Sequence, residues 1–276
     1  MTSYLVMLQT NSNQPFIFSS PRLREQIGAS FEITLLSHWV KKEAKEILEA
    51  KKLPPSFWVS DSSGKVIVLF TGHGDEPKAK AKVLIRRVTL RALTEAPGLD
   101  VTGVFVKASS SAVDADDLQE LDRVFLEYSL NRHPAAARFP QFPFLERADE
   151  SALPAVAPLT KHDTIRIYKT ARAVGVKESY EGRTKRKEQK KVEYTEGSQP
   201  TVSIDFNSIL STATKEDAKP EHKLSLPARV KRAWALPARF KQLDDIAGHL
   251  KTSMADLYRD PTRLEAAFQE TALGEQ

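Results

Sequence analysis

The chain has 276 residues, an apolar share of 41% and a formal net charge of +5, so it can bury the core of one or two domains. The absence of cysteine excludes disulfides and thiolate metal sites and fits a reducing compartment. No stretch resembles a signal peptide or supplies the roughly 18 apolar residues of a membrane span, so we expect a cytoplasmic protein without membrane contact. The modest positive charge permits an anionic partner without requiring one.

The beginning of the chain predicts a strand followed by a long helix. Residues 4–8 form a short apolar run rich in strand formers. Ser19 and Ser20 are candidate N-caps before Pro21, and apolar residues recur at helical spacing after it. The helix is expected to continue to about residue 52, where two prolines follow.

The next segment predicts two strands, a helix and a further strand. Residues 56–60 and 65–70 are expected to form a hairpin around Asp61-Ser62-Ser63-Gly64, with Asp61 capping the turn. Residues 78–95 predict a helix and residues 99–108 a strand. The apolar members of that helix are Val83, Leu84, Val88, Leu90 and Leu93. The order βαββαβ is that of an α+β, ferredoxin-like domain, here with helical additions.

The remainder divides into a further helix, a linker and a tail. Asp114 is expected to cap a helix that runs to residue 131. We predict a domain over residues 1–148, a basic and partly disordered linker over 149–224 and a small helical region over 225–276. The sequence LPAR occurs twice in that last region, by chance or as two similar helix starts.

The stretch QTNSNQPFIFSSPRLREQIGAS carries a family resemblance. It resembles the opening of the large, polymerase-like palm subunit of type III CRISPR effector complexes and its stand-alone relatives, which read Q-x-F/Y-I/L-F-x-S and then L-R-x-x-x-G-A-S. The matching residues are Gln14, Phe16, Ile17, Phe18, Ser20, Leu23, Arg24, Gly28, Ala29 and Ser30. The resemblance covers residues 1–148 and implies a palm domain.

Beyond residue 148 the resemblance is faint. Relatives often carry a cysteine-containing knuckle before a G-L-P-A-like sequence, whereas ERADESALPA, residues 146–155, has no cysteine. A zinc knuckle at this place would therefore lack its ligands. Relatives also have a second palm with a G-G-D-D hairpin, and neither G-G-D-D nor G-G-D-E occurs in this chain.

Palm chemistry requires carboxylates, because they hold the two divalent metals that bridge the triphosphate and the attacking hydroxyl. The family places them at the end of the first strand and in the hairpin. Here the strand ends in neutral residues 8–11, and Asp61 is the one acid of the hairpin. His73, Asp75 and Glu76 are close together, but acids there fit a helix N-terminus. We predict no catalytic residue, no metal site and no cofactor.

Two groups of basic residues are candidate binding sites. Arg22 and Arg24 lie where a palm faces its nucleotide and could hold a phosphate, or could pair on the surface with Glu25. A second group could bind a nucleic-acid backbone, with Tyr180 and Tyr194 stacking on bases, or could belong to a solvated linker. It consists of Arg183, Lys185, Arg186, Lys187, Lys190 and Lys191.

The resemblance and the missing carboxylates together imply a non-catalytic palm protein. It would bind RNA or a partner in a type III CRISPR-like or nucleotide-signalling defence system. Its partner could be a second palm protein or another copy of itself. One alternative is an active nucleotidyl cyclase or transferase with divalent metal held by Asp61, Asp75 and Glu76, or completed by a second palm in trans. Another is a purely structural scaffold subunit.

Overall fold

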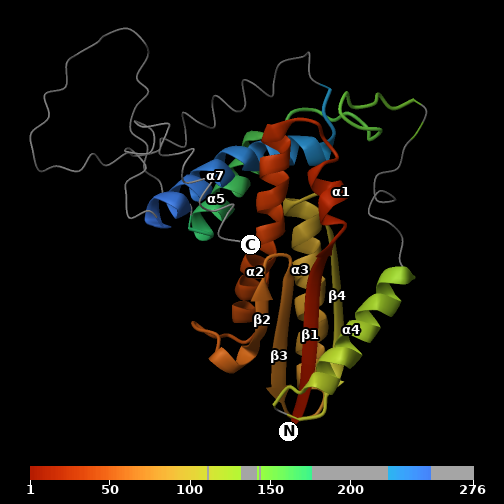
Figure 1. The fold of residues 1–276 in the computed structure, drawn as a ribbon, viewed down its shortest axis with the longest axis vertical. Helices are drawn as coiled ribbons and strands as arrows, with labels where there is room; N and C mark the ends of the chain where they lie inside the picture. The colour runs from red at the N-terminus through yellow and green to blue at the C-terminus, as the bar shows by residue number, and fades with distance from the viewer. Residues whose placement is uncertain (111, 132–141, 143, 176–222, 250–276) are drawn as a thin grey trace, which may run out of the picture. The chain divides into compact units, whose positions relative to one another are not determined.

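The structure, a computed structural model, describes residues 1–110, 112–131, 142, 144–175 and 223–249 (Figure 1). Its centre is a four-stranded sheet in the order β2-β3-β1-β4 with every neighbouring pair antiparallel. The strands are β1 (Thr2–Asn11), β2 (Trp58–Ser62), β3 (Lys65–Gly72) and β4 (Asp100–Ala108). Among the described helices, none combines the length and hydropathy that crossing a bilayer requires.

The helices complete the predicted order. They are α1 (Asn13–Ile17), α2 (Leu23–Ile47), the 3-10 turn η1 (Pro55–Phe57), α3 (Glu76–Glu95), α4 (Ala115–Leu130), α5 (Lys161–Ala173) and α7 (Leu226–His249). Long helices follow β1 and β3, and the strand order places β1 and β3 side by side in the centre. The predicted α+β, ferredoxin-like fold is therefore confirmed.

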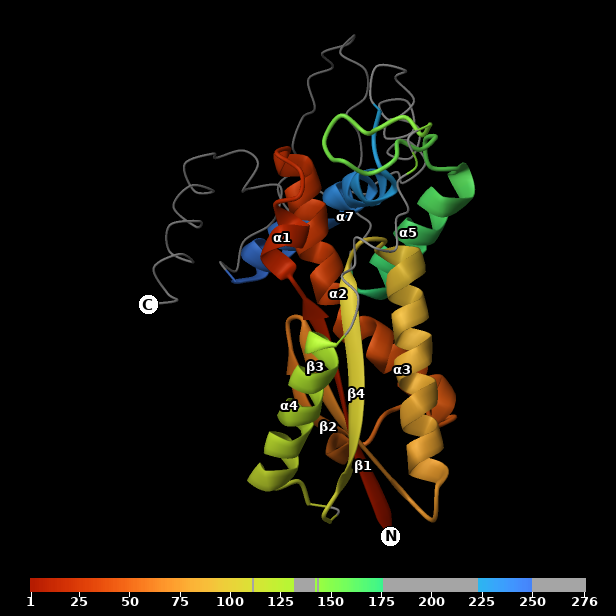
Figure 2. The ribbon, with the colours of Figure 1, turned by 90° about the vertical axis from the view of Figure 1, so that its right-hand side faces the viewer.

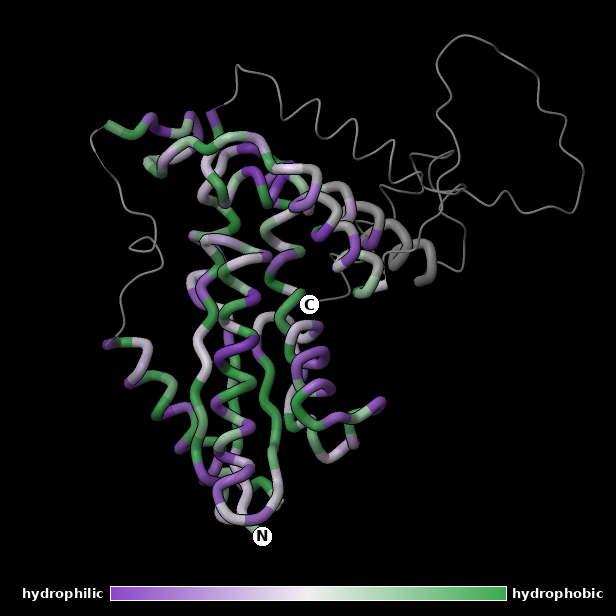
Figure 3. The backbone as a smooth tube through the Cα atoms, turned by 180° about the vertical axis from the view of Figure 1, so that it is seen from behind, coloured by the Kyte–Doolittle hydropathy of each residue, from purple (hydrophilic) through white to green (hydrophobic). Residues whose placement is uncertain are grey.

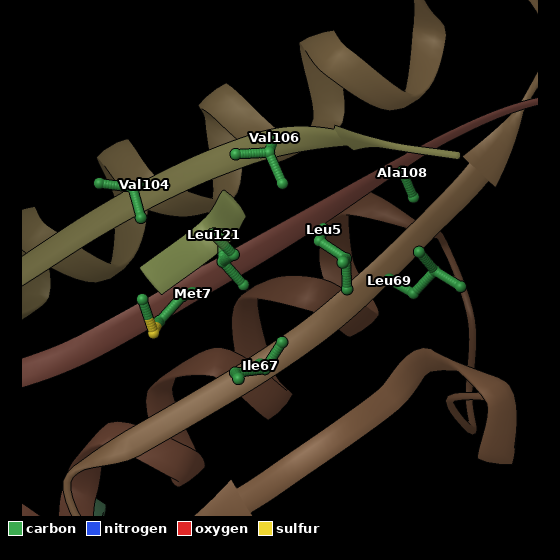
Figure 4. Close-up of a cluster of buried hydrophobic side chains, with 8 residues drawn as sticks. All are labelled: Leu5, Met7, Ile67, Leu69, Val104, Val106, Ala108 and Leu121. Atoms are coloured by element: carbon green, nitrogen blue, oxygen red, sulfur yellow. The ribbon is translucent and has the colours of Figure 1, made fainter. Parts of the chain in front are cut away.

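The two faces of the sheet are covered by different helices. Figure 2 shows α4 on one side of the sheet and α2 and α3 on the other. Leu5 and Met7 of β1 face α4, where they pack with Leu121 in the buried cluster drawn in Figure 4. Val6 and Leu8 alternate with them and are fully buried on the opposite face. Both faces of β1 are thus apolar, and Figure 3 shows hydrophobic residues running along the strands.

The helix starts differ in how well they were predicted. Asp114 caps α4 through a reciprocal capping box with Asp117, as expected. The prediction that Ser19 or Ser20 caps the long helix is wrong, because Arg22 occupies the N-cap and no side chain caps the helix end. The Ser20 hydroxyl instead bonds to the carboxylate of Glu25.

The apolar residues predicted for the inner face of α3 do not all face the core. Only Leu84 and Val88 of the five are buried, and the small side chains of Ala81 and Ala92 complete the inner face. Small residues let a helix axis approach its neighbours closely. The other three apolar members are exposed, namely Val83, Leu90 and Leu93.

The chain divides into two compact units. One comprises Met1–Ala157 and Pro220–Ala235, and the other comprises Pro158–Lys219 and Leu236–Gln276. The first unit thus contains residues from all three predicted segments. The division falls within α7, whose start is the first LPAR sequence, while Pro237 of the second lies inside the helix. Only the first LPAR sequence therefore begins a helix.

Candidate functional site

The end of β1 consists of neutral residues, and the buried Asp100 at the start of β4 lies opposite Asn11 in the sheet. The backbone amide of Thr10 donates to the carbonyl of Gly64 over 2.8 Å, and the Thr10 hydroxyl donates to the same oxygen over 3.2 Å. The side-chain amide of Asn11 donates to the Thr102 hydroxyl over 2.9 Å. Gly64 has a φ of 78°, which glycine adopts without strain. These bonds join the end of β1 to the hairpin turn and to β4.

Asp61 is exposed, and its carboxylate accepts a hydrogen bond of 2.9 Å from the hydroxyl of Ser37 on α2. The expectation that Asp61 caps its own turn is therefore wrong. The hydrogen bond ties the hairpin to the long helix, so the single acid of the hairpin has a structural role.

The second acidic cluster lies at the start of α3. Asp75 is the N-cap residue, and Glu76 forms an ion pair of 2.6 Å with Lys80 one turn later. The hydrogen bond from Lys80 lowers the pKa of Glu76. Within the part of the chain that the structure describes, no three histidine or acidic side chains are placed to hold a metal ion together.

The predicted phosphate site lies at the start of α2. Arg22 and Arg24 are both half-buried, and Arg24 already interacts within the chain. Below them Glu25 is fully buried and forms an ion pair of 3.4 Å with Arg232 of α7. The expected surface pairing of Arg22 or Arg24 with Glu25 thus differs from the structure, in which Glu25 is buried and pairs with an arginine from a distant part of the sequence.

Lys231 of α7 is the central residue of this region. Its side chain is only 2% exposed, and its ammonium donates to the carbonyl of Phe16 over 2.6 Å and to the hydroxyl of Ser19 over 2.8 Å. The ammonium also lies 3.9 Å from the centre of the Phe16 ring, within range of a cation–π interaction. Lys231 therefore donates hydrogen bonds to two oxygens of the short segment that joins β1 to α2.

Glu32 of α2 is the acidic counterpart of Lys231. It is fully buried, and among the described residues neither carboxylate oxygen has a hydrogen-bond partner. Burial raises the pKa of Glu32 well above its ordinary value, and the charge of Lys231 opposes that shift. Burial in turn lowers the pKa of Lys231, against the attraction of Glu32 and Glu25. Glu32 and Lys231 are thus two buried groups whose charges attract each other.

Gly28 explains how α7 approaches α2 so closely. A Cβ at this position would lie 1.8 Å from the carbonyl oxygen of Lys231. The two helix backbones are therefore in direct contact at Gly28, and only glycine fits there. Three residues on, Trp234 is fully buried against Phe31, with ring centres 5.5 Å apart.

The segment that precedes α7 is held by the cysteine-free knuckle sequence. The backbone amide of Asp149 donates to the carbonyl of Lys223 over 2.7 Å, and that of Val156 donates to the carbonyl of Leu224 over 2.9 Å. Glu150 accepts from the hydroxyl of Ser225 over 2.5 Å. These hydrogen bonds join residues 149–156 to the segment that precedes α7.

Sequence reasoning missed Glu32 and Lys231, and the structure brings them together although 199 positions separate them. The usable signal was weak: Glu32 interrupts the apolar spacing of α2, and Lys231 stands between Val230 and Trp234 in a largely apolar helix. The basic group from Arg183 to Lys191, by contrast, lies outside the described residues.

Comparisons with known proteins bear on the fold. No protein-family model and no curated protein sequence matches the chain. Eighteen chains of solved structures match it. One belongs to a structure titled "Type III-B Cmr-beta Cryo-EM structure of the Apo state", with 12% identity and a TM-score of 0.42. The match covers 88% of this chain and 32% of that one, so this chain spans about a third of that chain's length.

Proposed function

We propose that this chain is a non-catalytic palm-domain protein that binds RNA or a protein partner in a type III CRISPR-like or nucleotide-signalling defence system. The observation that carries the proposal is the chemistry of the palm edge. Thr10 and Asn11 end the first strand without a carboxylate, and Asp61 is bonded to Ser37. Asp100, opposite Asn11 in the sheet, is the other carboxylate of this edge and is buried. Among the described residues no three acidic or histidine side chains come together, and two divalent ions in phosphoryl transfer need several carboxylates.

The opening sequence supports the assignment to a defence system, because Gly28 and the residues around it match the palm subunits of type III effectors. In this chain the same stretch also receives α7, through the contacts of Lys231 with Phe16 and Ser19. The loop that would face a nucleotide is thereby fixed. Arg22 beside this loop supplies a guanidinium of the kind that binds phosphate.

The first prediction concerns nucleotide turnover. The purified chain should convert neither ATP nor GTP to cyclic or linear products with magnesium or manganese, because the paired carboxylates are missing. Product formation can be followed by chromatography and mass spectrometry. Product that disappears with Asp61→Ala would favour the alternative of an active cyclase, whereas product that persists in the double variant Asp61→Ala, Asp75→Ala would show that the site lies elsewhere.

The second prediction concerns RNA. Binding of single-stranded RNA should weaken steeply with salt, since neutralised phosphates release counterions. Replacing the six residues between Arg183 and Lys191 named above with serine should reduce the slope of log K against log salt by up to about 4, taking about 0.7 per phosphate. Fluorescence anisotropy across a salt series measures this slope.

A control for that experiment replaces two exposed lysines of α2, Lys41→Ser and Lys42→Ser, and should change the slope by less than about 0.7, the contribution of a single phosphate contact. Binding that is insensitive to salt would instead indicate a stacking pocket. No RNA binding at any salt concentration would remove the RNA part of the proposal and leave the scaffold alternative.

A further inference from the structure

The outer face of α3 is both apolar and basic. Val83, Leu90 and Leu93 are 39%, 50% and 45% exposed. With Arg86 they recur at the spacing i, i+3, i+7, i+10, which places them on one face of the helix. Lys82 lies beside them and is also exposed, whereas Arg87 forms ion pairs with Glu43 and Glu46 of α2. In all, α3 has six basic and two acidic residues, a formal net charge of +4.

The outer face of α4 has the opposite character. Leu126 and Leu130 are 60% and 77% exposed and lie one turn apart on the side of the helix away from the core residue Leu121. Exposed Asp116 and Glu127 lie along the same side, where Glu127 forms an ion pair of 3.2 Å with Arg123. Helix α4 has five acidic residues and one basic residue, a formal net charge of −4.

The two faces cannot meet within one molecule, because α3 and α4 cover opposite sides of the sheet (Figure 2). Neither face suits a symmetric pairing with itself, since α3 against α3, or α4 against α4, would bring like charges together. An α3 face against an α4 face joins apolar residues to apolar residues and basic residues to acidic ones. The complementary surface for each face is therefore present on a second copy of this chain.

We propose that this protein self-associates head to tail, the outer face of α3 in one copy docking on the outer face of α4 in the next. Such an interface is heterologous, so one copy retains a free α3 and the other a free α4, and the assembly grows into a ring or a filament. One pair of helices is at the small end of interface sizes, so association is micromolar or weaker and decreases with salt. The inference is independent of the proposed function, because it uses neither the palm edge nor the basic group.

Sedimentation velocity at low salt tests the proposal with the full chain. The wild-type protein should show a mass that increases with concentration up to about 1 mM. The variant Leu90→Ser, Leu93→Ser and the variant Leu126→Ser, Leu130→Ser should each be monomeric. An equimolar mixture of the two should form a 1:1 dimer and nothing larger, because the mixture contains one intact α3 face and one intact α4 face. Leu23→Ser, which changes a leucine that is 69% exposed at the start of α2, is the control and should associate as the wild type does.

Charge reversal gives a second test with a different expected outcome. Lys82→Glu with Arg86→Glu takes the formal net charge of α3 from +4 to 0, and Asp116→Lys with Glu127→Lys takes that of α4 from −4 to 0. Each double variant alone should therefore associate more weakly than the wild type. Their mixture should associate more strongly than either variant alone, because the unchanged α3 of one can then meet the unchanged α4 of the other.

Three results would overturn the proposal. A wild-type chain that stays monomeric at the highest concentration is one, and association that survives either serine variant is another. In the third, the serine variants mix without forming a dimer, which would place the contact elsewhere. If RNA bound to α3 with the same salt dependence while no self-association occurred, α3 would be a nucleic-acid surface instead.

Discussion

Replacing Gly28 with valine is expected to lower the free energy of unfolding by about 3 kcal/mol or more, because the new side chain would overlap backbone atoms of α7. Even the Cβ of alanine would lie 1.8 Å from the carbonyl oxygen of Lys231 and 2.7 Å from its carbonyl carbon. Backbone cannot rotate away as a flexible side chain can. Helix α7 must therefore shift as a whole, which would separate Trp234 from Phe31 and Lys231 from Phe16.

The alanine variant tests this contact because its expected effect on stability is opposite in sign to that of the same substitution in an open helix. In an open helix, glycine to alanine stabilises by about 1 kcal/mol. Gly28→Ala should instead destabilise this protein, while Ser30→Ala, an exposed position two residues on, should change stability by less than about 0.5 kcal/mol. Urea denaturation followed by circular dichroism measures all three variants. A Gly28→Ala protein more stable than the wild type would show that α2 and α7 do not touch at this position.

The order of strands and helices could be predicted because it depends on local patterns. The apolar run of residues 4–8, the glycine-containing turn at Gly64 and the cap at Asp114 each indicate a structure from a few neighbouring residues. The orientation of α3 could not be predicted in the same way. Burial of Ala81 in place of Val83 depends on how closely the helix packs on its neighbours, which composition does not reveal.

The prediction of a non-catalytic palm depends on residues that the sequence alone displays. Neutral residues at the end of β1 are visible in the sequence, and they suffice to question catalysis. The burial of Lys231 is not visible, because a lysine is almost always exposed and its partners, Phe16 and Ser19, lie more than 200 positions earlier. The role of Gly28 was likewise hidden, since a glycine in a helix does not say which backbone approaches it.

Replacing Lys231 with methionine is expected to lower the free energy of unfolding by about 3 to 5 kcal/mol at neutral pH, the typical effect of removing one partner from a buried ionic group. Methionine fills a similar volume, so the loss is electrostatic. The carbonyl of Phe16 loses its donor, and the buried carboxyl groups of Glu25 and Glu32 lose a nearby positive charge. Lys42→Met on the exposed side of α2 is the control and should change stability by less than about 0.5 kcal/mol.

The effect of Lys231→Met should depend on pH through Glu32. The pKa of Glu32 in the folded wild type is already above its ordinary value of 4.5, so the unfolded chain releases this proton first. Stability is therefore lost as the pH rises from about 4.5 through the folded pKa. Removing the charge of Lys231 raises the folded pKa of Glu32 further, so in the variant the loss of stability continues to higher pH. The loss of stability caused by Lys231→Met should accordingly be smallest in acid and grow toward neutral pH.

Adding Glu32→Gln should remove much of this growth, because glutamine cannot ionise, whereas Glu46→Gln on the exposed side of the same helix should not. Urea denaturation at a series of pH values measures each variant. A deficit that is constant with pH, or unaffected by Glu32→Gln, would show that Glu32 and Lys231 do not form a buried pair.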